Sequence, residues 1–215
     1  AGGEHLDLEV ATGHVVDLLG EVQSEFVEDV LRRPGRLPAH VDGALRLDDR
    51  RRRNGGGAGK RGAFAEVKAD EVKKILDNIK TLDRDEWARE WCKVGLEHEK
   101  HGDERARAGA PSKELAEIYH SAFAYCMLGR YPVASSPGKR EAYKHSVRQY
   151  RKAGPHLDPP LQVVEIPFEG KKLVGYLRIP KGVTKPPVVM NWGGVDGWKE
   201  DRERPNQRIM RQGMA

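Results

Sequence analysis

Long apolar runs are absent from this chain of 215 residues, in which 38% of residues are hydrophobic and 33% are charged. No window approaches the roughly 18 consecutive apolar residues of a membrane-spanning helix. Residues 1–5 carry neither the basic nor the apolar segment of a secretory signal. Together with a mean hydropathy of −0.71, these absences predict a cytoplasmic protein with no membrane partner. Because the first residue is not Met, we expect a fragment or a processed product.

Cysteine is scarce, and its scarcity excludes a disulfide-rich fold. The two cysteines, Cys92 and Cys126, fall on separate predicted helices. Two thiols in a chain of this length indicate a reduced protein, which agrees with a cytoplasmic location. A helix-to-helix disulfide stays open as an alternative.

Excess positive charge is confined to one stretch near the N-terminus. The formal net charge is +5, and residues 32–61 hold ten Lys or Arg against three Asp or Glu. Aromatic residues for base stacking are not interleaved with the basic run 50–53, so we expect a solvated tether and not a nucleic-acid site. The glycines that follow do not form a phosphate-binding loop, because Lys60 is followed by Arg61 and not by Ser or Thr. We therefore expect no cofactor, and we expect residues 1–65 to be a poorly ordered segment and linker.

Residues 66–158 have the period of amphipathic helices. Apolar residues recur three and four positions apart, which predicts about four helices with short connections, packed as one unit. Asp83 with Glu86 three residues later is typical of a helix start, as is Ser136 followed by Pro137. The stretch as a whole predicts a compact helical region.

Three residues of this region could place metal ligands on one helical face: Glu97, His98 and His101. The H-E-x-x-H arrangement of metalloproteases is absent, and histidines at the edge of a core are far commoner than metal ligands. We therefore expect no metal site here.

After residue 160 the period changes from helical to strand-like. Alternating residues in 161–168 and 173–179, separated by Glu169-Gly170, predict a hairpin. The apolar run 188–192 is typical of a strand buried on both faces of a parallel sheet. We expect a helix over 199–211, with Pro205 as a defect in its interior, and the start of another strand at 213–215.

The C-terminal two-thirds resemble a known family. The segments that carry the resemblance are VEIPFEGKKLVGYLRIPKG, PPVVMNWGGVDGWKED and RQGMA, with G-R-Y-P at 129–132 and K-x-x-A-Y at 139–143. They resemble the opening of α/β-hydrolases of the FrsA-like, 2,6-dihydroxypseudooxynicotine hydrolase-like group. The resemblance implies an α/β fold in which a helical cap (66–158) precedes the first strands of an incomplete hydrolase sheet (159–215, truncated).

The same resemblance implies where the chemistry lies. Gly193, Gly194 and Val195 would form the loop that donates to the oxyanion of the intermediate, and Asp196 would be an acid near the nucleophile. A glycine pair after a strand lets backbone N–H groups approach a substrate closely. From the residues alone, a tight strand exit explains Gly193-Gly194 equally well.

The family's nucleophile motif, G-x-S-x-G, does not occur in the chain. The resemblance therefore implies the N-terminal portion of a serine hydrolase for an ester, amide or C–C bond in a small-molecule substrate, lacking the Ser/His/Asp triad. We expect this chain alone to be inactive and poorly stable in its C-terminal third. A non-catalytic helical interaction module is the alternative, although no 34-residue repeat supports it. A homodimer stays open.

Overall fold

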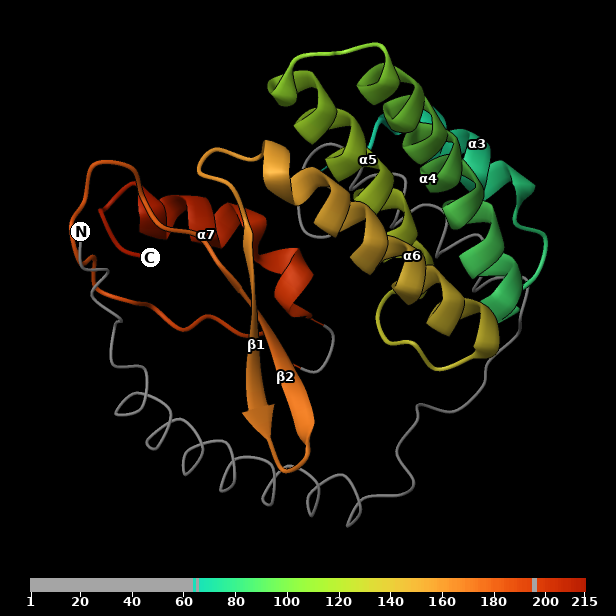
Figure 1. Cartoon of the computed structure of the whole chain (residues 1–215). Coiled ribbons are helices and arrows are strands. Elements are labelled where there is room, and N and C mark those ends of the chain that lie inside the picture. Colours follow the sequence, from blue (N-terminus) through green and yellow to red (C-terminus); the bar gives the residue numbers. More distant parts are fainter. Residues whose placement is uncertain (1–63, 65, 195–196) are drawn as a thin grey trace. The chain divides into compact units, whose positions relative to one another are not determined.

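The computed structural model describes residue 64 and residues 66–194 and 197–215, which lie in one compact unit, Gly43–Ala215 (Figure 1). The predictions for residues 1–63, including the basic run and the glycine linker, lie outside the described residues. Helices precede a hairpin, and two short helices follow it. In chain order the elements are α3 (Ala69–Asn78), α4 (Arg84–Arg107), α5 (Ser112–Arg130), α6 (Pro137–Ala153), η2 (Gly154–His156), β1 (Gln162–Phe168), β2 (Lys171–Leu177), η3 (Lys199–Arg202) and α7 (Glu203–Met210).

Helix α5 packs against both α4 and α6, and apolar side chains from all three make the core. The core is rich in rings: Trp91 is fully buried, and it lies 5.5 Å from Trp87 and 6.3 Å from Tyr125 between ring centroids. A close crossing of α4 and α5 is made possible by Gly95. A Cβ there would lie 2.7 Å from Cys126 Sγ, so the two helices approach at the level of the backbone.

Side-chain caps mark the starts of α4 and α6, the two starts that the sequence predicts from Asp83 and Ser136. The Asp83 carboxylate accepts hydrogen bonds from the N–H groups of Asp85 (3.0 Å) and Glu86 (2.7 Å) at the start of α4. Glu86 does not complete a capping box. Its carboxylate instead accepts from the N–H groups of Lys80 (2.8 Å) and Thr81 (3.0 Å), and so fixes the connection from α3.

The predicted hairpin is present. Strands β1 and β2 pair antiparallel with Val163 opposite Tyr176, and the turn residues Glu169 and Gly170 both have positive φ, 45° and 70°. Two positive φ values in a two-residue turn match the right-handed twist of the strands. Tyr176 places the hairpin against the helices, with its ring centroid 5.4 Å from that of Tyr150.

The buried strand predicted at 188–192 is wrong. These residues are not in a strand, and Val188, Met190 and Trp192 are 74%, 53% and 61% exposed. A strand of this kind is buried only when neighbours flank it and helices cover both faces. In the described residues its partner is Ala215 alone, which accepts from Val189 N–H (2.7 Å) and donates to the Pro187 carbonyl (2.8 Å). These two hydrogen bonds are those of a parallel strand pair, but the pairing extends over one residue only.

The single helix predicted over 199–211 is also wrong in detail. The chain forms η3 and then starts again as α7, so that Pro205 is the third residue of α7. The first N–H groups of a helix have no intrahelical partner, so a proline there removes no hydrogen bond. The predicted defect is therefore an ordinary helix start.

Candidate oxyanion loop and its surroundings

The loop after residue 192 closes on itself at a glycine. A Cβ at Gly193 would overlap the carbonyl oxygen of Gly197, whereas a Cβ at Gly194 would meet no atom within 4 Å. Position 193 therefore accepts only glycine, and position 194 does not share that restriction. Val195 and Asp196, the other two residues predicted for the site, lie outside the described residues.

A charged side chain, which the sequence analysis missed, fills the space left by the glycines. Arg202 Nη2 lies 3.0 Å from the Cβ position of Gly193 and 2.6 Å from that of Gly197. The guanidinium thus packs on the loop backbone, where any larger residue would displace it. Its position at the end of η3 gives no periodic signal, so the sequence pattern could not identify it.

Several buried polar atoms gather immediately after the loop. Within the described part of the chain, Trp198 Nε1, Glu200 Oε2, Asp201 Oδ1 and Arg202 Nε are buried without a hydrogen-bond partner. Most buried polar atoms in proteins are paired, so four such atoms within five consecutive residues are a local concentration of polar groups. The residues after the glycine pair therefore form a polar environment next to the loop.

The helical region holds these residues in place through a buried arginine. Arg130, the last residue of α5, is 1% exposed and pairs with Asp201. Its guanidinium also lies 5.0 Å from the centroid of the Trp198 ring, which in turn lies 4.4 Å from the ring of Tyr143 on α6. Asp201 accepts a further hydrogen bond from Trp198 N–H, at 2.9 Å. Both α5 and α6 thus contact the segment that follows the loop.

A second buried ion pair attaches α7 to the hairpin. Arg178, directly after β2, pairs with Glu203 at the start of α7, and both side chains are almost fully buried. Arg178 also donates to the backbone carbonyls of Asp158 (2.8 Å) and Pro159 (2.9 Å). Burial raises the pKa of Tyr150, whose hydroxyl donates to Glu203 at 3.3 Å. The pair therefore joins the hairpin, α7 and the connection from the helical region.

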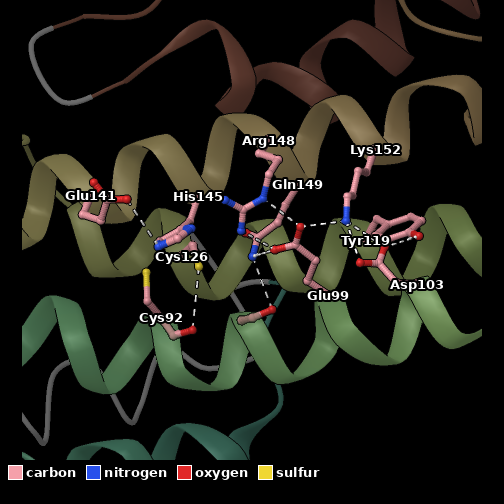
Figure 2. Close-up of polar contacts among 11 residues, drawn as sticks. Cys92, Glu99, Asp103, Tyr119, Cys126, Glu141, His145, Arg148, Gln149 and Lys152 are labelled. Carbon is pink, nitrogen blue, oxygen red and sulfur yellow. Dashed lines mark hydrogen bonds and ion pairs between the residues drawn. The ribbon is translucent and has the colours of Figure 1, made fainter.

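Between α4 and α6 lies a buried charge network (Figure 2). Glu99 is 5% exposed and accepts from Arg148 at 2.8 and 2.7 Å, from Lys152 at 2.9 Å and from Gln149 at 3.1 Å. Burial alone would raise the pKa of Glu99, but hydrogen bonds from Arg148, Lys152 and Gln149 outweigh it and lower the pKa to about 2. Lys152 extends the network to Asp103 at 2.7 Å.

The two histidines considered as metal ligands, His98 and His101, lie in different environments. His98 stacks on Tyr125, with ring centroids 5.2 Å apart, and its Nε2 lies 3.3 Å from a Glu71 carboxylate oxygen. Glu97 and His101 are exposed. Among the residues that the structure describes, no three His, Cys, Asp or Glu side chains form a group that could hold a metal ion.

One serine does meet a histidine, though not in a nucleophile elbow. Ser112 Oγ lies 3.3 Å from His156 Nδ1, at an exposed position at the start of α5. The imidazole stacks on Tyr119, with centroids 6.2 Å apart. Because Ser112 is exposed and does not lie in a G-x-S-x-G sequence, this contact is interpreted as a local link between α5 and η2.

Comparisons with known proteins decide the family. A family model described as "Esterase FrsA-like" matches residues 62–214. The chain belongs to this FrsA-like esterase family. Every helix in the described ranges is too short or too polar to cross a lipid bilayer.

Relatives in the family are named as hydrolases and esterases. The chain is 26% identical over 129 residues to 2,6-dihydropseudooxynicotine hydrolase of Paenarthrobacter nicotinovorans, covering 60% of this chain and 35% of that protein. It is 27% identical over 131 residues to esterase FrsA of Vibrio vulnificus strain YJ016, covering 60% and 30%. It is 29% identical over 143 residues to hydrolase ORFZ of Pyricularia oryzae, covering 61% and 33%. The FrsA-like chain thus spans about a third of the length of these curated relatives.

A solved structure agrees with this assignment. The crystal structure of 2,6-dihydroxy-pseudo-oxynicotine hydrolase superposes with a TM-score of 0.58 at 23% identity, covering 67% of this chain and 40% of that one. At this identity the similarity shows the fold: the FrsA-like chain shares the hydrolase fold over the superposed part.

Proposed function

We propose that this chain is the N-terminal portion of an α/β-hydrolase that cleaves an ester, amide or C–C bond. In this proposal α3–α6 are the cap, and residues 193–195 are the loop whose backbone N–H groups donate to the oxyanion. Membership of a family of hydrolases supports the reaction class. The observation that carries the loop assignment is the closure at Gly193, where any side chain would overlap the Gly197 carbonyl.

The chemistry of such a loop is electrostatic. Attack on a carbonyl carbon moves negative charge onto the oxygen, and fixed N–H donors stabilise that charge more than they stabilise the substrate. Removing one donor of this kind typically raises the barrier by about 3–4 kcal/mol. A loop whose backbone packs against the half-buried side chain of Arg202 needs little rearrangement during the reaction.

The nucleophile would come from residues outside this sequence, because no G-x-S-x-G occurs among the 215 residues. We therefore expect no hydrolysis of p-nitrophenyl esters by the chain above the buffer rate. Turnover that survives removal of every contaminating esterase, and that follows the chain through gel filtration, would contradict this part of the proposal.

The loop itself can be tested without turnover. An aryl phosphonate is a stable tetrahedral anion that mimics the intermediate, and it can be titrated into the ¹⁵N-labelled chain. We expect concentration-dependent shifts of the Gly193 and Gly194 amide signals. The variant Gly193→Ala should abolish these shifts because it displaces the loop. Gly175→Ala on β2, where a Cβ has a clearance of 4.0 Å, should retain them.

Two results would overturn the loop assignment. One is a titration in which amides elsewhere shift while those of residues 193–197 stay unchanged at saturating phosphonate. The other is Gly193→Ala binding the phosphonate as tightly as the unaltered chain, since the loop geometry would then be irrelevant.

A further inference from the structure

A cavity of about 670 Å³ opens between α6, β2 and η3. This volume lies in the range of about 300–1,000 Å³ that is usual for small-molecule sites. Cationic side chains dominate its lining, and none of the lining residues is a carboxylate. The lining residues are Tyr143, Lys144, Val147, Arg148, Arg151, Lys152, Val174 and Lys199.

The cations of this cavity differ in how far carboxylates already neutralise them. Arg148 and Lys152 are held from the α4 side by Glu99, as Figure 2 shows. Lys144 has an exposed partner, Glu141, at 3.0 Å. Lys199 lies 3.1 Å from the buried carboxylate of Glu200.

Arg151 is different, because its described contacts are with a tyrosine. Its Nε donates to the Tyr176 hydroxyl at 3.2 Å, and its Cζ lies 5.9 Å from the centroid of the same ring. Lys199 Nζ lies 5.3 Å from that ring as well. The hydrogen bond with Tyr176 is the main cause that raises the pKa of Arg151. Glu200 and Glu165 add longer-range attraction, but neither makes an ion pair with it in the described structure. An exposed guanidinium, oriented by one hydrogen bond and with donors left over, therefore lines the cavity.

The remaining lining is apolar. Val147 and Val174 contribute aliphatic surface from α6 and β2, and Tyr143 contributes a ring. Burial raises the pKa of Tyr143 to about 12, so its phenol is neutral at pH 7. The cavity thus offers an apolar part beside a guanidinium, and a guanidinium can bind a carboxylate through two parallel hydrogen bonds.

We propose that this cavity binds a small ligand that joins an apolar ring to one negatively charged group, with Arg151 as the residue that recognises the charge. A carboxylate is the favoured anion, because the guanidinium can donate hydrogen bonds to both of its oxygens. The two valines would contact the apolar ring. The proposal stands on its own residues and does not depend on the loop at 193–195.

Benzoate is the probe for this proposal, with benzamide as its neutral isostere and inorganic phosphate as an anion without a ring. Binding to the intact ¹⁵N-labelled chain is followed by amide shifts. We expect benzoate to shift signals of Tyr143, Val147 and Val174, and to bind about tenfold or more tightly than benzamide. A tenfold difference corresponds to about 1.4 kcal/mol, within reach of a charge-assisted hydrogen bond.

Matched variants separate recognition from net charge. Arg151→Gln should weaken benzoate about tenfold, and Arg151→Lys should weaken it less, because the charge stays and the fork is lost. Lys73→Gln removes the same charge from an exposed position on α3, 77% accessible, and should leave benzoate affinity unchanged. Circular dichroism melts check that each variant is folded.

The proposal is overturned if benzoate and benzamide bind equally, or if Arg151→Gln and Lys73→Gln behave alike. Phosphate binding as tightly as benzoate would overturn the assignment of the ring. These outcomes leave the phosphonate titration of the loop unaffected, because that experiment reports on Gly193 and Gly194.

Discussion

Glu99 shows how a single carboxylate is kept charged between two helices. It is almost inaccessible to solvent, yet four described hydrogen bonds and ion pairs from α6 hold it ionised. A buried charge is tolerated only when its partners replace the lost water. Removing the carboxylate leaves Arg148 and Lys152 facing each other, but both are partly exposed, so water can reach them again.

Replacing Glu99 by Gln should therefore lower the free energy of unfolding at pH 7 by about 2–3 kcal/mol, below the upper range for fully buried pairs. Urea unfolding followed by circular dichroism measures the change. The exposed neighbour Glu97 provides the control, and Glu97→Gln should alter stability by less than about 0.5 kcal/mol.

The effect of Glu99 should depend on pH with a defined sign. Its pKa in the folded chain is about 2, against an ordinary value of 4.5. A carboxyl whose pKa is lowered by folding contributes stability above the unfolded pKa, and that contribution is lost as the pH falls. The stability difference between the unaltered chain and Glu99→Gln should shrink from pH 5 toward pH 2. A difference that stays constant over this interval would show that Glu99 is not ionised in the folded chain.

The thiols make a second prediction at this scale. Cys92 and Cys126 are free, and they are 6% and 0% exposed. A hydrogen bond with Cys126 and burial both raise the pKa of Cys92, which removes the reactive thiolate. Neither thiol should react with Ellman's reagent on the minutes timescale in the folded chain, whereas two should react in 6 M guanidinium chloride. Rapid reaction of one thiol without denaturant would contradict the packing of α4 on α5.

At the scale of elements, the crossing of α4 and α5 depends on a missing side chain. Alanine favours a helix over glycine by up to about 1 kcal/mol. A Cβ at Gly95, however, would lie 2.7 Å from Cys126 Sγ and 2.8 Å from the Ala122 carbonyl oxygen, so the helices would have to move apart. Gly95→Ala should therefore destabilise the chain by about 1–3 kcal/mol in spite of its propensity. Lys93→Ala at an exposed site of the same helix should be neutral, and equal melting temperatures for the two variants would refute this.

The helices and the hairpin were predictable because their signals are local. The side chains of Asp83 and Ser136 cap the first turns of α4 and α6, so these residues indicate where the helices begin. Glu169-Gly170 forms the hairpin turn because both residues adopt positive φ. The partners of the loop were not predictable. Arg130 pairs with Asp201 across 71 positions, and no period in the sequence joins such residues.

The strand predicted at 188–192 illustrates the opposite error. An apolar composition indicates that a segment can be buried in a sheet. The segment becomes a strand only when the backbone of a neighbouring strand is present to pair with it. Here the described chain supplies Ala215 alone as that neighbour. Gly193 was predicted from the family resemblance, while Arg202, which lies against it, was found only in the structure.

At the scale of the whole molecule, the exposed run 188–192 should dominate how solvent reaches the tryptophans. Trp192 is 61% exposed, whereas Trp87 and Trp91 are 3% and 0% exposed. Acrylamide should quench a red-shifted part of the emission most readily, and Trp192→Phe should remove that part. The half-buried Trp198 should be quenched less readily, and the buried Trp87 and Trp91 poorly. Uniform protection of all tryptophans would instead show that the run is covered in solution.

The buried guanidinium of Arg130 has a consequence for how ligands could enter. Separating α5 from η3 would leave Arg130 and Asp201 without each other, at a cost of about 3 kcal/mol for a largely buried pair. A hinged opening at this contact would then be present in fewer than about one molecule in a hundred. We therefore expect the helices of the proposed cap and the glycine loop to keep their relative positions. Ligands should then enter along α6 without a hinged opening of the cap.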